Sequence, residues 1–358
     1  MDDTSAYVEV SNRYPCENCW VIDLNCITIG VTSNESELPG ANYVCFRKAS
    51  LHELEACDYR VSLHVRKTLA SDEETWLAAH ADRSFRGERF KSGFYVTHHF
   101  GAPAFLFTIG HNYFVVGSTL DKLLWSYFTK VFLTVEAERR GYIHLKAACV
   151  DVDGTGLLLA GRGSGGKTVM LFEACRNGGT FVANTHCVVQ GRHVIGVHSP
   201  MRVRNDAVFA RSIRALQASK HVEAGEYVLR PGALFPRIGV RTVAGAICIV
   251  DYRPDRPALI EPLGANDALT FLELFAFPTI TYGIKDDILA SVGGDHFMFC
   301  EMMKDMKNKL ERLVAQIPAY YVSIDATRTR EWIHFRNIVL EPTPAATDGS
   351  HGWNEIRP

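Results

Sequence analysis

Short apolar runs separated by turns fill the first third of the chain, which predicts an α+β region with a mixed, mostly antiparallel sheet. The clearest runs are WVIDLNCITIGV (20–31), NYVCFR (42–47), GFYVTHHF (93–100), AFLFTIG (104–110) and NYFVVG (112–117). A helical pattern at 72–85, DEETWLAAHADRSF, interrupts them. We expect residues 1–117 to form an amino-terminal domain that presents a substrate or partner.

The hydrophobic period changes to three and four residues over 118–141, which predicts a long amphipathic helix between two domains. Ser118, with Asp121 three positions later, fits an N-terminal cap, and Gly141 fits the stop. Its apolar positions are Leu120, Leu123, Leu124, Tyr127, Phe128, Val131, Phe132 and Val135.

A β-hairpin is predicted next, because two apolar runs flank Asp153-Gly154, a pair typical of tight turns. Its second arm enters GRGSGGKT (161–168), and a helix ending at Gly178 follows. Further strands, among them GAICIVDY (245–252), and then helices at 266–277 and 297–317 complete a second domain, residues 118–341. The polar residues 342–358 predict a flexible tail.

Composition limits the classes of partner and the cellular compartment that are expected for the chain. The 358 residues suit two domains, and 38 basic against 40 acidic side chains give a formal charge of −2, so nucleic acid and acidic membranes are not expected partners. Ten scattered cysteines, no signal-peptide pattern and no apolar stretch of about 18 residues predict a reduced, cytoplasmic protein without a membrane anchor. Cys16 and Cys19 form an isolated C-x-x-C pair, which favours structural thiols over a zinc site.

The loop 161–168 fits G-x-x-x-x-G-K-[ST] at every fixed position and stands between a strand and a helix. Such a loop aims backbone N–H groups and a helix dipole at phosphates, which predicts binding of ATP or another nucleoside triphosphate. Lys167 would reach the outer phosphates and Thr168 a Mg²⁺ ion. A tight turn that only packs well is the alternative. The predicted binding residues are Gly161, Gly163, Ser164, Gly165, Gly166, Lys167 and Thr168.

Residues 139–189 resemble the HPr kinase/phosphorylase-like group, which is related to the phosphoenolpyruvate carboxykinase fold and includes peptide kinases of natural-product clusters. The similarity runs from Arg140-Gly141 through His144, the hairpin turn and the glycine loop to the next strand. The runs 227–236 and 241–252 look like later strands of the family. The resemblance implies an HPr kinase-like P-loop domain with a β-hairpin entering the loop, and ATP-dependent phosphorylation of a hydroxyl.

The chain departs from this family where catalysis is concerned. The family strand after the loop helix ends Ala-Asp-Asp, whereas FVANTHCVV (181–189) has Asn184 and Thr185 at the two acidic positions. Neither side chain is a base near neutral pH. His186, which strand alternation would place on the face of Asn184, and Asp251, at the end of an apolar strand, are candidate replacements. A buried strand histidine and a solvated strand end are the alternatives.

Three functions therefore remain. The first is a phosphotransferase acting on a peptide, protein or small metabolite, with Asn184, His186 and Asp251 as candidate catalytic residues. The second is a nucleotide-binding sensor or pseudokinase without turnover. The third is an ordinary P-loop ATPase with Asp251 as its metal ligand, against which the hairpin argues. Neither the acceptor nor the oligomeric state follows from the sequence, and a homo-oligomer is compatible with it.

Overall fold

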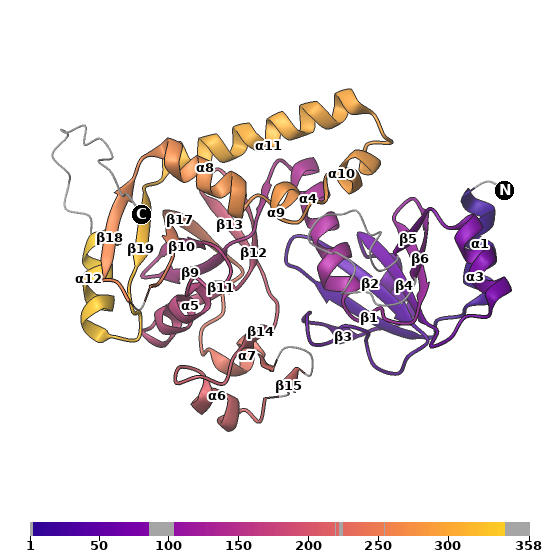
Figure 1. Ribbon diagram of the computed structural model, residues 1–358, viewed down its shortest axis with the longest axis horizontal. Helices are drawn as coiled ribbons and strands as arrows, with labels where there is room; N and C mark the ends of the chain where they lie inside the picture. The colour runs from indigo at the N-terminus through magenta and orange to yellow at the C-terminus, as the bar shows by residue number, and fades with distance from the viewer. Residues whose placement is uncertain (1–2, 86–103, 219, 222–224, 254, 341–358) are drawn as a thin grey trace.

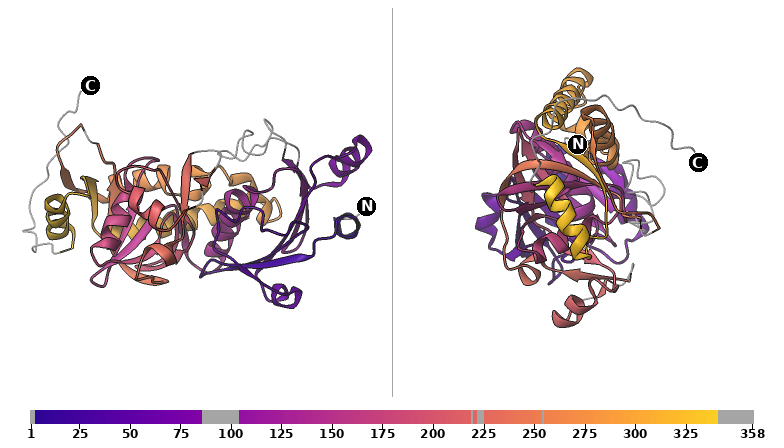
Figure 2. Two further views of the ribbon diagram at one scale, coloured as in Figure 1. Left: turned by 90° about the horizontal axis from the view of Figure 1, so that it is seen from below. Right: turned by 90° about the vertical axis from the view of Figure 1, so that its left-hand side faces the viewer.

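The computed structural model describes residues 3–85, 104–218, 220–221, 225–253 and 255–340, in which two large β-sheets and their helices form a mixed α/β protein. The sheets lie side by side along an elongated molecule, with α1 (Asp3–Arg13) at one end and α12 (Thr329–Val339) at the other (Figure 1, Figure 2). The predicted strand at 93–100 and the predicted tail at 342–358 lie outside the described residues.

The apolar runs of the first third build the first sheet, and its strand directions are mixed. β2, β4 and β7 are parallel neighbours, while the other pairs are antiparallel. The strand order is β3 (Arg47–Lys48), β1 (Asn18–Asp23), β2 (Thr28–Ser33), β4 (Tyr59–Val65), β7 (Asn112–Gly117), β6 (Ala104–Ile109) and β5 (Arg83–Phe85).

Two local predictions in this region need correction. The run 42–47 is a loop that reaches a strand only at its last residue, because Val44 is fully buried in the core beneath the sheet rather than paired within it. Helix α1, at the start of the chain, was not predicted, and its Val10 packs with Phe105 in a separate cluster. The helix predicted over 72–85 is confirmed only as far as His80, as α3 (Ser71–His80), because residues 83–85 pair with β6 as strand β5. A short α2 (Leu51–Glu55) was not predicted.

The helix predicted over 118–141 begins later than expected. It starts as a π-helix, η4 (Leu124–Thr129), continues as α4 (Lys130–Arg139) and stops before Gly141, which has a φ of 75°. Ser118 does not cap it, because residues 118–122 are a turn that leads out of β7.

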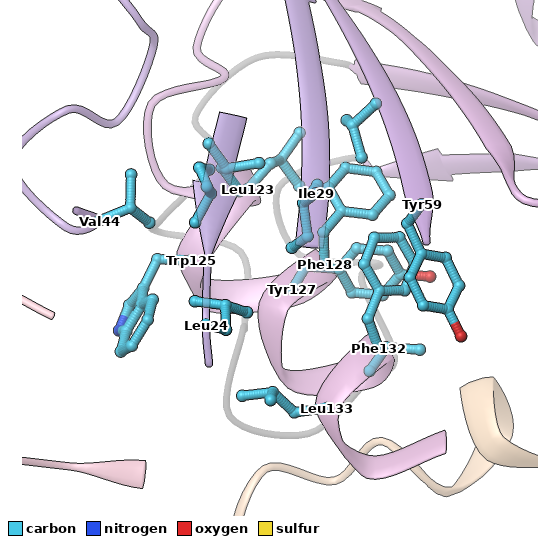
Figure 3. Packing of buried hydrophobic residues seen from close by; sticks show 14 of the residues in the cluster. Leu24, Ile29, Val44, Tyr59, Leu123, Trp125, Tyr127, Phe128, Phe132 and Leu133 are labelled. Carbon is cyan, nitrogen blue, oxygen red and sulfur yellow. The ribbon is translucent and has the colours of Figure 1, made fainter. Parts of the chain in front are cut away.

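This helix packs against the first sheet through its aromatic side chains. Phe132 stacks on Tyr59 with ring centroids 3.9 Å apart, and Figure 3 shows these side chains with Phe128 and Ile29 in one cluster. The same buried cluster includes Val188 and other side chains of the second sheet. The helix therefore joins the two sheets through one core, as expected of a junction, while the boundary after residue 117 stays a prediction.

The second sheet carries the glycine loop. Its main path is β11 (Thr180–Ala183), β9 (Ala148–Val152), β10 (Thr155–Ala160), β17 (Arg241–Val250), β13 (His193–Val197), β12 (His186–Gln190) and β8 (Ile143–Leu145). Beside this path, β19 (Ala319–Ser323) pairs with β17 and β18 (Leu259–Leu263) pairs with β19.

The predicted hairpin is confirmed. β9 and β10 pair antiparallel with Thr155 opposite Val152, and the turn residues Asp153 and Gly154 have φ values of 53° and 84°. Two consecutive left-handed residues fit the right-handed twist of the flanking strands, which explains the choice of Asp-Gly. β10 is also parallel to β17, and β17 to β19, so their carboxyl ends meet at one edge of the sheet.

The remaining elements cover this sheet or extend it. α8 and α11 pack on one face, whereas α5 and α12 share the core of the other face. α10 instead joins the core of the first sheet through Ile288. The bounds are α5 (Lys167–Arg176), α6 (Ala210–Ala215), α7 (Pro231–Leu234), α8 (Ala265–Phe275), α9 (Pro278–Thr281), α10 (Lys285–Ser291) and α11 (His296–Gln316). A small third sheet contains β14 (Met201–Val203), β16 (Glu226–Leu229) and β15 (Lys220–His221).

Two further predictions concern the cysteines and membrane-spanning helices. All ten cysteines lie within the described residues, and none of them forms a disulfide. In the described part of the chain, no helix has the length and apolar character required to cross a membrane.

Candidate functional site

The glycine loop has a backbone that only glycine accommodates at two of its positions. Gly161 has a φ of 148°, and a Cβ added there would lie 2.4 Å from the Val250 carbonyl oxygen. Gly166 has a φ of 91° and directly precedes α5. Packing against the end of β17 thus accounts for part of the glycine content. Packing does not account for Gly163, where an added Cβ meets nothing within 4 Å.

The Lys167 side chain folds back onto the first residues of the glycine loop. Its ammonium donates hydrogen bonds to the carbonyl oxygens of Gly161 and Arg162, both at 2.7 Å. Burial, and secondarily the charge of Lys146, lower the pKa of Lys167 to about 8. The two hydrogen bonds hold the ammonium at the loop, where the charged oxygens of a phosphate could replace the carbonyls as its partners.

A hollow of 280 Å³ extends from the loop toward β9 and β11. It lies at the carboxyl edge of the parallel strands, where ligands of open α/β sheets bind. The loop contributes Gly163, Ser164, Lys167 and Thr168, and α5 directs its N-terminal dipole to this side. The other lining residues include Lys146, Ala148, Asn184, Thr185, Ser199, Pro200, Arg202 and Glu226.

Asn184 lies in this hollow, in a fixed orientation. Its amide Nδ2 donates to the carbonyl oxygen of Pro200 at 3.2 Å, and the Ser199 hydroxyl donates to its Oδ1 at 2.6 Å. Thr185 lines the same hollow. Both positions that carry acids in the family that the sequence resembles thus line the hollow here as neutral side chains.

His186 does not line the hollow with Asn184. The chain bends at residues 184 and 185, so the strand alternation that predicted a shared face is interrupted before β12 begins. The His186 ring is fully buried and shares a hydrogen bond with His144, with 2.9 Å between Nδ1 and Nε2. Burial, followed by the nearby His144, keeps its pKa well below the ordinary value. The arrangement is that of a neutral core histidine.

Asp251 is held by two guanidinium groups. Its carboxylate accepts hydrogen bonds from Nε of Arg162 at 2.9 Å and from Nε of Arg253 at 3.0 Å, and a third from the Tyr321 hydroxyl at 3.3 Å. Burial raises its pKa, but the hydrogen bonds from Arg253 and Arg162 outweigh burial and lower it. Because Arg162 belongs to the glycine loop, Asp251 fixes the loop against β17. Asp251 does not line the hollow.

The donor set in the hollow does not fit a magnesium ion held by the protein alone. Mg²⁺ is usually bound through one or two carboxylates together with substrate phosphates. Among the described residues, no group of three or more His, Cys, Asp or Glu side chains could hold a metal. Glu226 is the carboxylate among the described lining residues, and it pairs with Arg202 at 3.8 Å. Thr168 remains the one predicted protein ligand.

Lys146 is a site residue that the sequence reading missed. It lines the hollow together with Lys167, and burial lowers its pKa. The register of the hairpin could have revealed this residue. Leu159 pairs with Ala148, and continuing the same register by two residues places Lys146 opposite Gly161, the first residue of the glycine loop. Arg202 and Glu226 come from the small third sheet, and no local pattern in the sequence points to them.

A larger hollow of 470 Å³ lies elsewhere, between the first sheet, α4 and α10. Its lining includes Arg83, Tyr127 and Asp287, and the Asp287 carboxylate accepts hydrogen bonds from both other side chains. None of its described lining residues belongs to the glycine loop. The hollow beside Lys167 is therefore the candidate site for phosphate chemistry.

Neither a protein-family model nor a curated protein sequence matches the chain. Among solved structures, the Hpr(Ser) kinase/phosphatase from Coxiella burnetii aligns with 55% of this chain and 97% of its own, at 9% identity and a TM-score of 0.27. An alignment with so low a TM-score carries no argument about activity. The functional conclusion depends on the loop and the residues around it.

Proposed function

We propose that the chain binds ATP, or another nucleoside triphosphate, at residues 161–168 and transfers its terminal phosphoryl group to a hydroxyl. The acceptor would be a peptide, a protein or a small metabolite, as in HPr kinase-like phosphotransferases, including those of natural-product biosynthesis. One observation carries the proposal: a complete glycine loop, entered by a hairpin strand, places Lys167 in a hollow that also receives Lys146.

Phosphoryl transfer requires phosphate binding, charge stabilisation and positioning of the reacting groups, and we assign each task to residues of the loop or the hollow. The backbone N–H groups of the loop and the first turn of α5 would hold the phosphates, and Lys167 and Lys146 would balance their charge. Asn184, already oriented by Ser199, would position the reacting groups at the wall of the hollow. Transfer depends mainly on positioning and charge stabilisation, so an acidic base is not indispensable. Mg²⁺ would arrive on the nucleotide, with Thr168 as its predicted protein ligand.

Binding without turnover is the second candidate, and the absence of a suitable base among the candidate residues favours it. Asn184 and Thr185 are neutral, His186 is buried, and Asp251 is paired with two arginines. The third hypothesis, an ordinary P-loop ATPase that uses Asp251 as its metal ligand, loses support, because this carboxylate is committed to Arg162 and Arg253.

The deciding experiment follows phosphate from γ-labelled ATP to water and to a library of peptides with Ser, Thr and Tyr hydroxyls, with mass spectrometry of the products. The phosphotransferase proposal expects labelled product from the wild type and loss of the label in Lys167→Met. Asn184→Asp, which restores an acid at the wall of the hollow, serves as the comparison. Label transfer only by Asn184→Asp would show that the wild type binds nucleotide without turnover.

A further inference from the structure

A second hollow, of 320 Å³, borders the same glycine loop on the side of β17 and β19. The phosphate hollow lies toward β9 and β11, so the loop separates the two. Gly166 and Val169, at the start of α5, contribute to the second hollow. The proposed function gives this space no role.

The lining of the second hollow is unsuited to phosphate. Its walls include the apolar side chains of Val169, Val250 and Ile324, and the Tyr252 ring stands beside them. Two carboxylates, Asp206 and Asp325, also line it, and none of its described residues is a lysine or an arginine. Apolar walls with an aromatic ring suit a flat, uncharged group, and carboxylates do not favour a phosphate. Asp325 is already paired with Arg328 at 3.2 Å, and Asp206 Oδ1 accepts hydrogen bonds from the N–H groups of Val208 and Phe209.

The second hollow is tied directly to the loop. The Tyr252 backbone N–H donates to the Gly165 carbonyl oxygen at 3.0 Å, and a Cβ added to Gly166 would lie 2.9 Å from Tyr252 Cβ. Val169 follows Thr168 on the first turn of α5, so phosphates held along Lys167 and Thr168 lead toward this space. Its volume lies within the usual range of roughly 300 to 1,000 Å³ for small-molecule sites.

We propose that this second hollow takes the base of the nucleotide, with the ring of Tyr252 stacked against it. The inference rests on the proposed nucleotide site and extends it. The loop and the phosphate hollow would hold the charged end, and the Tyr252 hollow would hold the aromatic end. Base contacts of this kind make a nucleoside triphosphate bind more tightly than triphosphate alone.

Calorimetric titration with ATP and with inorganic tripolyphosphate tests this proposal, using the wild type, Tyr252→Ala and Tyr252→Phe. The wild type should bind ATP more tightly than tripolyphosphate. Tyr252→Ala should lose about ten-fold or more in ATP affinity, the size of one base-to-aromatic stack, while its tripolyphosphate affinity stays unchanged. Tyr252→Phe keeps the ring and should retain the wild-type affinity for ATP.

Four outcomes overturn the inference, and they can be told apart. If the wild type binds ATP no better than tripolyphosphate, or if Tyr252→Ala binds ATP as well as the wild type, the base does not lie in this hollow, and the phosphate site stands. If the wild type binds neither compound, the proposed function fails together with the inference. A parallel loss of both affinities in Tyr252→Ala would show that the ring supports only the loop.

Discussion

Replacing Lys167 by Met removes the ammonium from the glycine loop and keeps an unbranched side chain of similar length. In the structure this ammonium donates two hydrogen bonds of 2.7 Å to loop carbonyls. A bound triphosphate would supply charged oxygens instead, and such charge-assisted bonds contribute about 1.5 to 3 kcal/mol. We therefore expect Lys167→Met to weaken ATP binding roughly ten- to hundred-fold.

Calorimetry at fixed pH and salt measures this loss, and two controls separate binding from folding. Lys304→Met removes an exposed lysine of α11, whose side chain is 69% accessible, and should leave ATP affinity unchanged. Thermal unfolding should show at most a modest loss for Lys167→Met, about 1 kcal/mol for each hydrogen bond to the loop. Equal ATP affinity for Lys167→Met and the wild type would refute the claim that the loop binds the phosphates.

Two more predictions concern stability. Burial is the main reason that the folded-state pKa of His144 is lowered to about 3 and that of His186 lies well below its ordinary value. The contribution of these two neutral histidines to the free energy of unfolding is therefore fully present above about pH 6.5 and is lost as the pH falls. Urea unfolding should show a loss of up to about 1.4 kcal/mol per pH unit for each histidine, and His144→Gln should flatten this slope; equal slopes would contradict the assignment. Gly196→Ala would place a Cβ 1.9 Å from the Val182 carbonyl oxygen and should cost roughly 3 kcal/mol, whereas Gly232→Ala, whose nearest contact is 3.9 Å away, should be nearly neutral in the same assay.

The sequence by itself determined the elements whose signals are local. The Asp153-Gly154 pair predicted the hairpin because two consecutive left-handed residues suit only a few residue types, and the structure confirms it. The apolar runs 104–110 and 112–117 predicted β6 and β7, whose alternate side chains are buried in two different clusters. The three-and-four period predicted α4, because that spacing places apolar side chains on one side of a helix. The start of the helix at Ser118 was wrong because a cap pattern also fits a turn.

Tertiary structure decided which of the candidate residues share a site. Asn184 and His186 are two positions apart, yet a bend puts one in the hollow and the other in the core, and no local pattern reports that bend. The sequence made Asp251 a candidate metal ligand, but in the structure its carboxylate is paired with Arg162 and Arg253. The pairing of Asp251 with Arg162 joins residues 89 positions apart in the chain, and the energy of such a pairing depends on burial and distance. For that reason residue types alone could predict a phosphate-binding loop, but not the side chains that surround it.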